Sequence, residues 1–321
     1  MIQLDKTPYL ELDNYLELDN YKAPKNIHAF YLAMNDNKKI RVFFWKLKEN
    51  RGTILLQQGH NEFIEKYYET IQNFIDRGFN VVCFDWRGQG LSDRMTKNEH
   101  KQYIESFNIH DDDLTFIIDN LIKKELPGPL IGVGHSMGGC LMLSSLKNNE
   151  KKFDGMILSA PMLGFKFNIL MNIIVFFSNL FLSDDDYLFG SKPNLGKETP
   201  FNENELTNDK FRYERTLRLV RKNPKVRLWG ITNLWAKAVK NRLRLLKNAK
   251  WIEKIELKIL IINSVEDKVV SPQFIQNYGK RIKNSILINF KNCGHEIFME
   301  TDNKRKLLWN EIDKYIDDLG I

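Results

Sequence analysis

The segment Gly134-His135-Ser136-Met137-Gly138 has the residue types and the spacing of a nucleophilic turn, G-x-S-x-G. It follows the apolar run PLIGV and precedes the helical pattern GGCLMLSSLKNN. In such a strand–turn–helix unit, the turn holds the serine in a strained conformation, and the small residues beside it let the strand and the helix approach closely. The pattern predicts that Ser136 is a nucleophile at the carboxyl edge of a sheet, beside a helix N-terminus that favours negative charge.

A serine hydroxyl is a poor nucleophile unless a base removes its proton, and histidine often serves as that base. Of the six histidines, His295 is the best candidate, because its turn NCGHE follows the apolar run SILINF and precedes the C-terminal helical pattern. His135, inside the nucleophilic turn, is expected to point away from the direction of attack. We therefore predict that His295 is the base.

An imidazole that acts as a base needs a carboxylate to hold its tautomer and to stabilise its charged form. Two candidates follow the apolar run KILIIN: Asp267 is preferred, and Glu266 is its local rival. The resulting order along the chain is Ser136, Asp267, His295. This order differs from the orders of both major serine-protease classes.

The negative charge that develops on a substrate carbonyl oxygen needs N–H donors to stabilise it. The residue after the nucleophile supplies one, so the backbone N–H of Met137 is the first predicted donor. The second is expected from the loop QQGHNE, where Gly59 lets the backbone turn inward and the N–H of His60 is the candidate. The side chain of His60 is given no catalytic role.

These residues lie in a regular alternation of strand-like and helical patterns. Several strand-like runs, such as TILLQ, VVCFD and ILIIN, are continuously apolar, which is typical of parallel strands covered on both faces. The predicted strands are 40–47, 53–57, 80–85, 130–134, 155–160, 258–263 and 285–290, and the predicted helices are 63–76, 103–123, 138–148, 272–281 and 304–319. The alternation predicts an α/β fold with a mostly parallel central sheet and flanking helices.

The same alternation predicts a core of residues 27–160 and 252–321, interrupted by a helical insertion at 161–251 that would form a cap or lid. The insertion opens with the most apolar stretch of the chain, residues 163–182. Its length would suit a membrane-spanning helix, but Lys166 and several asparagine and serine residues interrupt it, so a cap helix over an apolar pocket is preferred. Residues 1–26 are acidic, contain YLELDN twice, and are expected to form an exposed N-terminal segment.

The composition excludes several classes of protein. A chain of 321 residues with 43% hydrophobic residues, 28% charged residues and a mean hydropathy of −0.41 is neither disordered, nor collagenous, nor a simple coiled coil. Three cysteines without metal-ligand spacing favour a reducing compartment and no structural zinc. The net charge of +7 arises between residues 220 and 258, which hold twelve lysines and arginines and only two acidic residues.

Residues 234–247 of that basic segment have the pattern of an amphipathic helix, with an apolar side and a basic side. A basic amphipathic helix with a tryptophan is typical of a membrane surface, although a solvated helix face packed on a core gives the same pattern. No nucleic-acid recognition motif accompanies the charge, so nucleic acid is not a predicted partner. The candidate residues for contact with substrate or membrane are Trp235, Lys237, Lys240, Arg242, Arg244 and Lys247.

Six segments together resemble the α/β-hydrolase superfamily, in particular its bacterial lysophospholipase and monoacylglycerol lipase branch, with a domain of the serine aminopeptidase S33 type. These segments are QQGHNEFIEKY, FDWRGQGLSDR, GHSMGG, SAPMLG, EDKVV and GHEIFMETD. Within the insertion, PMLG, RYERTLRL and TNLWAKA are more similar to bacterial membrane-associated lysophospholipases than to monoglyceride lipases. One departure is Gln58, where the branch usually has histidine before the glycine.

The resemblance implies a serine hydrolase that cleaves fatty-acyl esters of lysophospholipids through an acyl-enzyme, with no metal and no organic cofactor. The alternatives are a monoacylglycerol lipase or small-ester hydrolase, a serine aminopeptidase, and a lipid-binding module without activity. The implied partners are a lysophospholipid or monoglyceride substrate and, through the basic helix, an anionic membrane. The expected location is cytoplasmic, peripheral to the inner face of the cell membrane.

Overall fold

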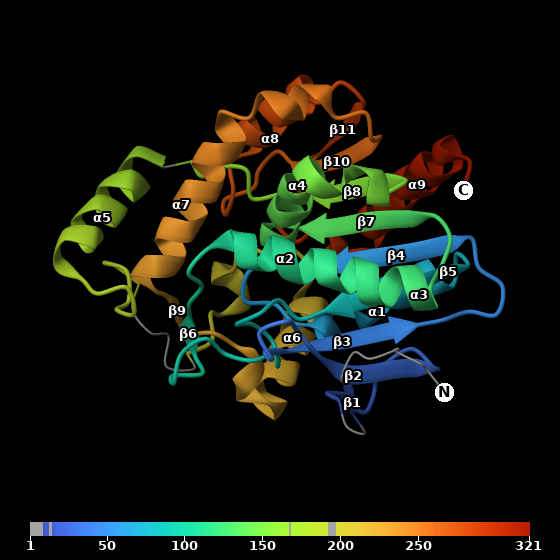
Figure 1. Cartoon of the computed structure of the whole chain (residues 1–321), viewed down its shortest axis with the longest axis horizontal. Helices are drawn as coiled ribbons and strands as arrows, with labels where there is room; N and C mark the ends of the chain where they lie inside the picture. The colour runs from blue at the N-terminus through green and yellow to red at the C-terminus, as the bar shows by residue number, and fades with distance from the viewer. Residues whose placement is uncertain (1–8, 13–14, 167, 192–196) are drawn as a thin grey trace.

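A nine-stranded sheet forms the centre of the molecule, and helices cover both of its faces (Figure 1). The structure is a computed structural model that describes residues 9–12, 15–166, 168–191 and 197–321. The strands of this sheet are β1 (Tyr9–Glu11), β2 (Ile27–Ala33), β3 (Lys39–Trp45), β4 (Gly52–Gln57), β5 (Phe79–Phe84), β7 (Leu130–His135), β8 (Gly155–Ser159), β10 (Ile259–Ser264) and β11 (Ser285–Phe290).

The spatial order of the strands is β1-β2-β3-β5-β4-β7-β8-β10-β11. The six strands from β5 to β11 run parallel to one another, whereas β1, β2 and β3 pair in antiparallel fashion. The prediction of a mostly parallel sheet is therefore confirmed. All seven predicted strands are present, with ends within two residues of those expected from the apolar runs.

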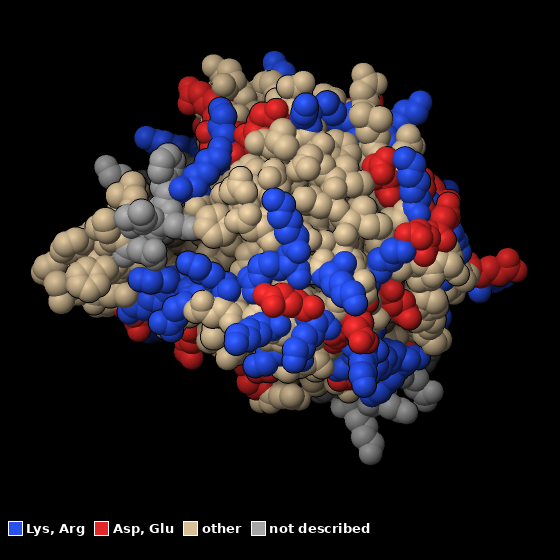
Figure 2. Space-filling model, turned by 90° about the horizontal axis from the view of Figure 1, so that it is seen from above, with Lys and Arg blue, Asp and Glu red and all other residues tan. Residues whose placement is uncertain are grey.

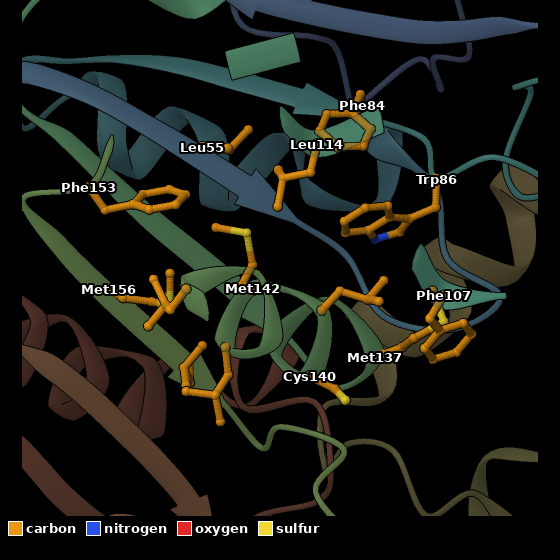
Figure 3. Close-up of a cluster of buried hydrophobic side chains, with 14 of the residues drawn as sticks. Leu55, Phe84, Trp86, Phe107, Leu114, Met137, Cys140, Met142, Phe153 and Met156 are labelled. Atoms are coloured by element: carbon orange, nitrogen blue, oxygen red, sulfur yellow. The ribbon is translucent and has the colours of Figure 1, made fainter. Parts of the chain in front are cut away.

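Two hydrophobic cores lie on the two faces of the sheet. One face is covered by α1 (Tyr68–Ile75) and α9 (Asp302–Leu319), and the other by α2 (Phe107–Ile117), α3 (Lys123–Glu125), α4 (Met137–Asn149) and α8 (Pro272–Arg281). Figure 3 shows the second core, in which side chains of α4 meet those of the strands and of α2. The labelled residues are Leu55, Phe84, Trp86, Phe107, Leu114, Met137, Cys140, Met142, Phe153 and Met156. Strands that are apolar along their length thus bury both faces.

The cap segment, residues 161–251, lies between β8 and β10 and contains α5 (Asn168–Phe181), α6 (Lys210–Lys222) and α7 (Asn233–Lys247). Its short strand β9 (Gly230–Ile231) pairs in parallel with β6 (Lys101–Gln102) of the core. This two-residue strand was not expected in the helical insertion, because so short a strand leaves no apolar pattern in the sequence. The boundaries of the cap as a unit of its own stay a prediction.

The apolar stretch at residues 163–182 contains the 14-residue helix α5. Among the helices that the structure describes, none is long and apolar enough to cross a membrane. Residue 167, within this stretch, lies outside the described residues. The helix projects from the body of the molecule beside α7 (Figure 1).

The described part of the N-terminal segment contributes a strand to the sheet and two buried side chains to a core, so it is not exposed throughout. The first copy of YLELDN supplies β1, although its residues 13–14 lie outside the described part of the chain. In the second copy Leu16 is buried. Tyr21, just beyond it, is also buried, and its hydroxyl donates a hydrogen bond to the carbonyl of Lys66 at 3.0 Å. The described part of this acidic segment therefore adds one strand to an open edge of the sheet.

Candidate active site

Four loops that carry predicted residues meet at one edge of the sheet. His60 follows β4, Ser136 follows β7, Asp267 follows β10 and His295 follows β11. Because these strands run parallel, their carboxyl ends lie at the same edge, where ligands bind in folds of this kind. The topology therefore brings together residues that are distant in the sequence.

A chain of hydrogen bonds joins Ser136, His295 and Asp267, and all three side chains are buried. The Oγ of Ser136 lies 2.9 Å from Nε2 of His295. The Nδ1 of His295 lies 2.6 Å from Oδ2 of Asp267. Because an ionised carboxylate only accepts, Nδ1 carries a proton, and Nε2 is left to accept the proton of the hydroxyl. The arrangement is that of a nucleophile, a base and an orienting carboxylate.

The backbone of Ser136 is strained, with φ at +49°, a region that residues other than glycine rarely adopt. Its N–H donates to the carbonyl of Ser159 at 3.0 Å, and its own carbonyl accepts from the N–H of Met162 at 2.9 Å. A Cβ on Gly138 would lie 2.5 Å from the carbonyl oxygen of Gln58, so no larger residue fits there. The surroundings hold the serine in this conformation, as expected for a nucleophilic turn.

Asp267 faces the histidine, and its rival Glu266 does not. The Oδ1 of Asp267 accepts the backbone N–H groups of Val269 at 2.7 Å and Val270 at 3.0 Å. Burial alone would raise the pKa of Asp267, but His295 and these hydrogen bonds outweigh burial and lower it. Glu266 instead accepts the N–H of Asn292 at 3.0 Å, at the surface.

Two further histidines near Ser136 are neutral at physiological pH. Burial lowers the pKa of His135 to about 3. The Nδ1 of His135 lies 3.2 Å from the carbonyl oxygen of Ser159, so its ring is not bonded to the hydroxyl of Ser136. Burial lowers the pKa of His60 to about 4, and its ring packs against Trp235 with the ring centroids 4.6 Å apart.

The turn after β4 packs directly against the nucleophile. A Cβ on Gly59 would lie 3.0 Å from the Cβ of Ser136, so the backbone of this turn approaches the serine as closely as it can. Met137 is the first residue of α4, and its N–H therefore belongs to the helix N-terminus. The backbone N–H groups of Met137 and His60 stay the predicted donors to an oxyanion.

Gln58 anchors this turn from inside the core. Its Nε2 donates to Oδ1 of Asp85 at 3.1 Å, and its carbonyl oxygen accepts from Nε1 of Trp86 at 3.0 Å. An amide supplies an N–H donor, as an imidazole also can. With glutamine in place of histidine, the turn is therefore still hydrogen-bonded to the residues that follow β5.

A cavity of about 290 Å³ lies beside Ser136 and His295. Residues of the core and of the cap segment line it together, and the cap contributes apolar side chains such as Leu217 and Val220 as well as the cation Arg227. Cavities that combine apolar walls with a few polar groups are typical of small-molecule sites. This one suits a ligand with both an apolar and a polar part.

The family model described as serine aminopeptidase, S33, matches residues 48–302, a range that contains all four loops of the site. The chain belongs to this family. It is therefore a hydrolase with the α/β-hydrolase fold, and the family resemblance expected from the sequence is confirmed.

Relatives of this S33 hydrolase have names from lipid metabolism. The chain is 28% identical to the probable lysophospholipase L2 of Haemophilus influenzae over 269 residues, 83% of this chain and 84% of the relative. It is 25% identical to the lysophospholipase L2 of Escherichia coli strain K12 over 296 residues, 86% of this chain and 84% of the relative. A soluble variant of the monoglyceride lipase of Saccharomyces cerevisiae shares the fold, with a TM-score of 0.74, 19% identity, and coverage of 94% of this chain and 100% of that one.

Sequence reasoning missed a buried ion cluster in the S33 hydrolase. The Nζ of Lys66 lies 2.5 Å from Oε1 of Glu62 and 2.6 Å from Oε1 of Glu296, which is next to His295. Glu62 also accepts the N–H of Gly59 at 2.5 Å. The cluster therefore ties the turn after β4 to the loop that carries the base. The charged residues stand in the segments QQGHNEFIEKY and GHEIFMETD, where Glu62 and Lys66 are four residues apart, but nothing in the sequence pairs Lys66 with Glu296.

The pKa values of the two carboxyl groups in this cluster are shifted in opposite directions. Burial raises the pKa of a carboxyl group, but Lys66 outweighs this effect at Glu62, whose pKa is lowered to about 2. At Glu296, burial and the neighbouring Glu62 prevail over Lys66, and the pKa is raised. One lysine thus stabilises the ionised form of one carboxylate more than that of the other.

Two of the six residues predicted to contact substrate or membrane from α7 are placed elsewhere. Trp235 is 6% exposed and packs against His60, and Arg242 is 5% exposed and pairs with Asp111 at 2.7 Å. Neither faces a membrane, because the apolar side of α7 packs on the core. Arg242, one of the candidates for contact with substrate or membrane, is instead held by an ion pair inside the protein.

The other four basic residues of α7 lie on its outer side. Lys237 pairs with Asp184 at 2.6 Å. The exposed ones are Lys240, Arg244 and Lys247. A contact of these residues with a membrane stays a prediction.

Proposed function

We propose that this S33 hydrolase cleaves the fatty-acyl ester of lysophospholipids. The observation that carries the proposal is the hydrogen-bonded chain from Ser136 through His295 to Asp267, beside a cavity of mixed polarity. The two relatives named lysophospholipase L2 support the lipid class, since each alignment spans more than four fifths of both chains. A monoglyceride, which has the same acyl-glycerol ester, is the alternative substrate.

In the proposed reaction, Ser136 Oγ attacks the ester carbonyl while Nε2 of His295 takes its proton. The N–H groups of Met137 and His60 stabilise the oxyanion, and Asp267 stabilises the imidazolium. The bond between the carbonyl carbon and the glycerol oxygen then breaks, and His295 returns the proton to that oxygen. Water, deprotonated by the same histidine, hydrolyses the acyl-enzyme. The products are a fatty acid and the glycerophospho alcohol.

The test combines labelling with turnover. We expect a fluorophosphonate probe to label the wild-type protein and not Ser136→Ala, and the wild type to hydrolyse lysophospholipids faster than aminoacyl amides with kcat/KM at least tenfold higher. The measurements are gel fluorescence of the labelled protein and release of fatty acid or amine. Wild-type protein without label at Ser136 would exclude a serine nucleophile, and a preference for aminoacyl amides would exclude the lipid-ester function.

The same proposal places the enzyme on an anionic lipid surface, with α5 as the element that enters it. Six large apolar side chains along this helix are between 47% and 68% exposed: Leu170, Ile173, Phe176, Phe177, Leu180 and Phe181. Figure 2 shows an apolar projection at the left of the molecule, where α5 lies in Figure 1, with lysine and arginine side chains beside it. Apolar patches of this kind on a protein surface mark interaction sites with proteins or membranes.

Charge complementarity favours a membrane as the partner. Helix α7 packs beside α5, and the Nδ2 of Asn233 donates to the carbonyl of Ser178 across the two helices at 3.4 Å. The exposed Lys240, Arg244 and Lys247 are therefore on the neighbour of the apolar helix, where each would contribute about 1 kcal/mol near anionic lipid. The cytoplasmic leaflet carries anionic lipid, and the three buried free cysteines fit the reducing compartment on that side.

The triple variant Phe176→Ser, Leu180→Ser, Phe181→Ser is expected to bind phosphatidylglycerol vesicles at least tenfold more weakly, because it removes three apolar side chains from the inserted face. Vesicle co-sedimentation measures the binding. Reversal of the charges of Lys240, Arg244 and Lys247 is expected to weaken binding to these vesicles but not to phosphatidylcholine vesicles. Hydrolysis of a water-soluble ester serves as the control for an intact site, and vesicle binding that survives the triple substitution would contradict docking through α5.

A further inference from the structure

The cavity beside Ser136 is lined by three cations, of which two are neutralised. Lys66 lies between two carboxylates, and Arg212 forms ion pairs with three. The third cation, Arg227, is part of the cap segment. Within the described residues its guanidinium has neither an ion pair nor a hydrogen bond. A cation that faces a cavity and has no carboxylate partner of its own is available to an anionic group of a ligand.

Glu198, whose pKa is affected by the charge of Arg227, already pairs with another arginine. Glu198 accepts a two-pronged hydrogen bond from Arg221, with distances of 2.7 and 2.5 Å. The hydrogen bond from Arg221 is the main cause that lowers the pKa of Glu198, and the charge of Arg227 adds to it. On the cavity wall, burial raises the pKa of Tyr213, and Arg227 partly offsets this rise. Arg227 and Tyr213 both line the cavity, so this positive charge lies at its wall.

The backbone beside Arg227 is fixed to the turn that is predicted to bind the oxyanion. The N–H of Leu228 donates to Oδ1 of Asn61 at 2.6 Å, and Nδ2 of Asn61 donates to the carbonyl of Leu228 at 3.1 Å. Asn61 directly follows His60. A second tie comes from His100, whose Nδ1 donates to the carbonyl of Arg227 at 3.0 Å. Within the described residues the guanidinium has no partner, while the backbone that carries it is held beside the turn that is predicted to bind the oxyanion.

We propose that Arg227 binds the phosphate of the lysophospholipid headgroup while the acyl ester lies at Ser136. This inference rests on the proposed function and names the group that separates its two candidate substrates. In a lysophospholipid the phosphate follows the ester after a short glycerol linker, whereas a monoglyceride has a neutral hydroxyl in its place. Arginine suits the task because its planar fork makes paired, charge-assisted hydrogen bonds to phosphate oxygens.

The experiment compares two soluble substrates with the same acyl chain, 1-octanoyl lysophosphatidic acid and 1-octanoylglycerol, with the full-length protein. We expect Arg227→Gln to lower kcat/KM for the phosphate-bearing substrate at least tenfold, mainly through KM, and to change that for 1-octanoylglycerol by less than twofold. Lys225→Gln is the matched control, since it removes the same charge at a position two residues away. The Lys225 side chain is exposed and pairs with Glu99. This variant is expected to leave both values unchanged.

A competition arm identifies the source of the phosphate. Glycerol 3-phosphate is expected to inhibit the hydrolysis of 1-octanoylglycerol competitively in the wild type, at least tenfold more weakly in Arg227→Gln, and more strongly than inorganic phosphate. Equal losses for both substrates, no loss for either, or equal inhibition by inorganic phosphate would overturn the assignment of a headgroup site. A wild type that hydrolyses neither octanoyl ester would instead overturn the proposed function, so the two failures are distinguishable.

Discussion

Replacing Asp267 with asparagine is expected to lower kcat about 10⁴-fold while the protein remains folded. One carboxylate oxygen of Asp267 accepts the N–H groups of Val269 and Val270, and the other accepts the Nδ1–H of His295. An asparagine must keep its carbonyl oxygen on the two backbone donors, so its NH₂ group would face the histidine. Nδ1 then has to accept, Nε2 carries the proton, and the imidazole can no longer deprotonate Ser136.

The matched control is Glu266→Gln, which removes the same charge one residue away. Glu266 accepts a hydrogen bond from the backbone of Asn292 at the surface, so a change of less than twofold in kcat is expected. Initial rates with a water-soluble ester give kcat, and thermal melts establish that both variants are folded. Full activity in Asp267→Asn would remove Asp267 from its role, and a comparable loss in Glu266→Gln would reassign that role to the rival.

The three hydrogen-bonded residues of the active site could be predicted from the sequence, because each follows an apolar run that forms a parallel strand. Chain order then brings Ser136, Asp267 and His295 to one edge of the sheet, whatever the details of packing. The ion pair of Lys66 with Glu296 could not be predicted in this way, since the two residues are 230 positions apart and no local pattern links them. The position of Arg227 in the cavity could not be predicted either, because it depends on contacts between the cap segment and the core.

The fold was predictable where burial is complete and less so at the sheet edge. Strand β2 was not predicted, although Ala29, Phe30 and Leu32 become buried where it pairs with β3. The ends of helix α7 were predicted almost to the residue. The surface against which its apolar side packs was not predicted. A hydrophobic face has the same pattern whether it enters a membrane or packs on a core, and Trp235 does the latter.

A second feature that depends on tertiary contact is the buried ion network of Arg41. In the sequence this residue interrupts an apolar strand and resembles an exposed position. In the structure its side chain is 1% exposed, and it donates to both oxygens of Glu65 and to Oδ2 of Asp85, all at 2.7 Å. The other oxygen of Asp85 accepts from Gln58 in the turn after β4. The network therefore joins β3 to the loops that shape the active site.

Arg41→Met is expected to lower the free energy of unfolding by about 3–5 kcal/mol, because it leaves two buried carboxylates without their cation. Denaturant unfolding followed by fluorescence measures this loss. Arg221→Met is the control: it breaks an equally two-pronged but exposed pair with Glu198, which is worth about 1 kcal/mol or less. The double variant Arg41→Met, Glu65→Met is expected to recover part of the loss, since one unpaired carboxylate is removed and Asp85 keeps its hydrogen bonds from Gln58 and from the backbone. Equal losses for the buried and the exposed pair would mean that burial adds nothing to the cost of breaking the network.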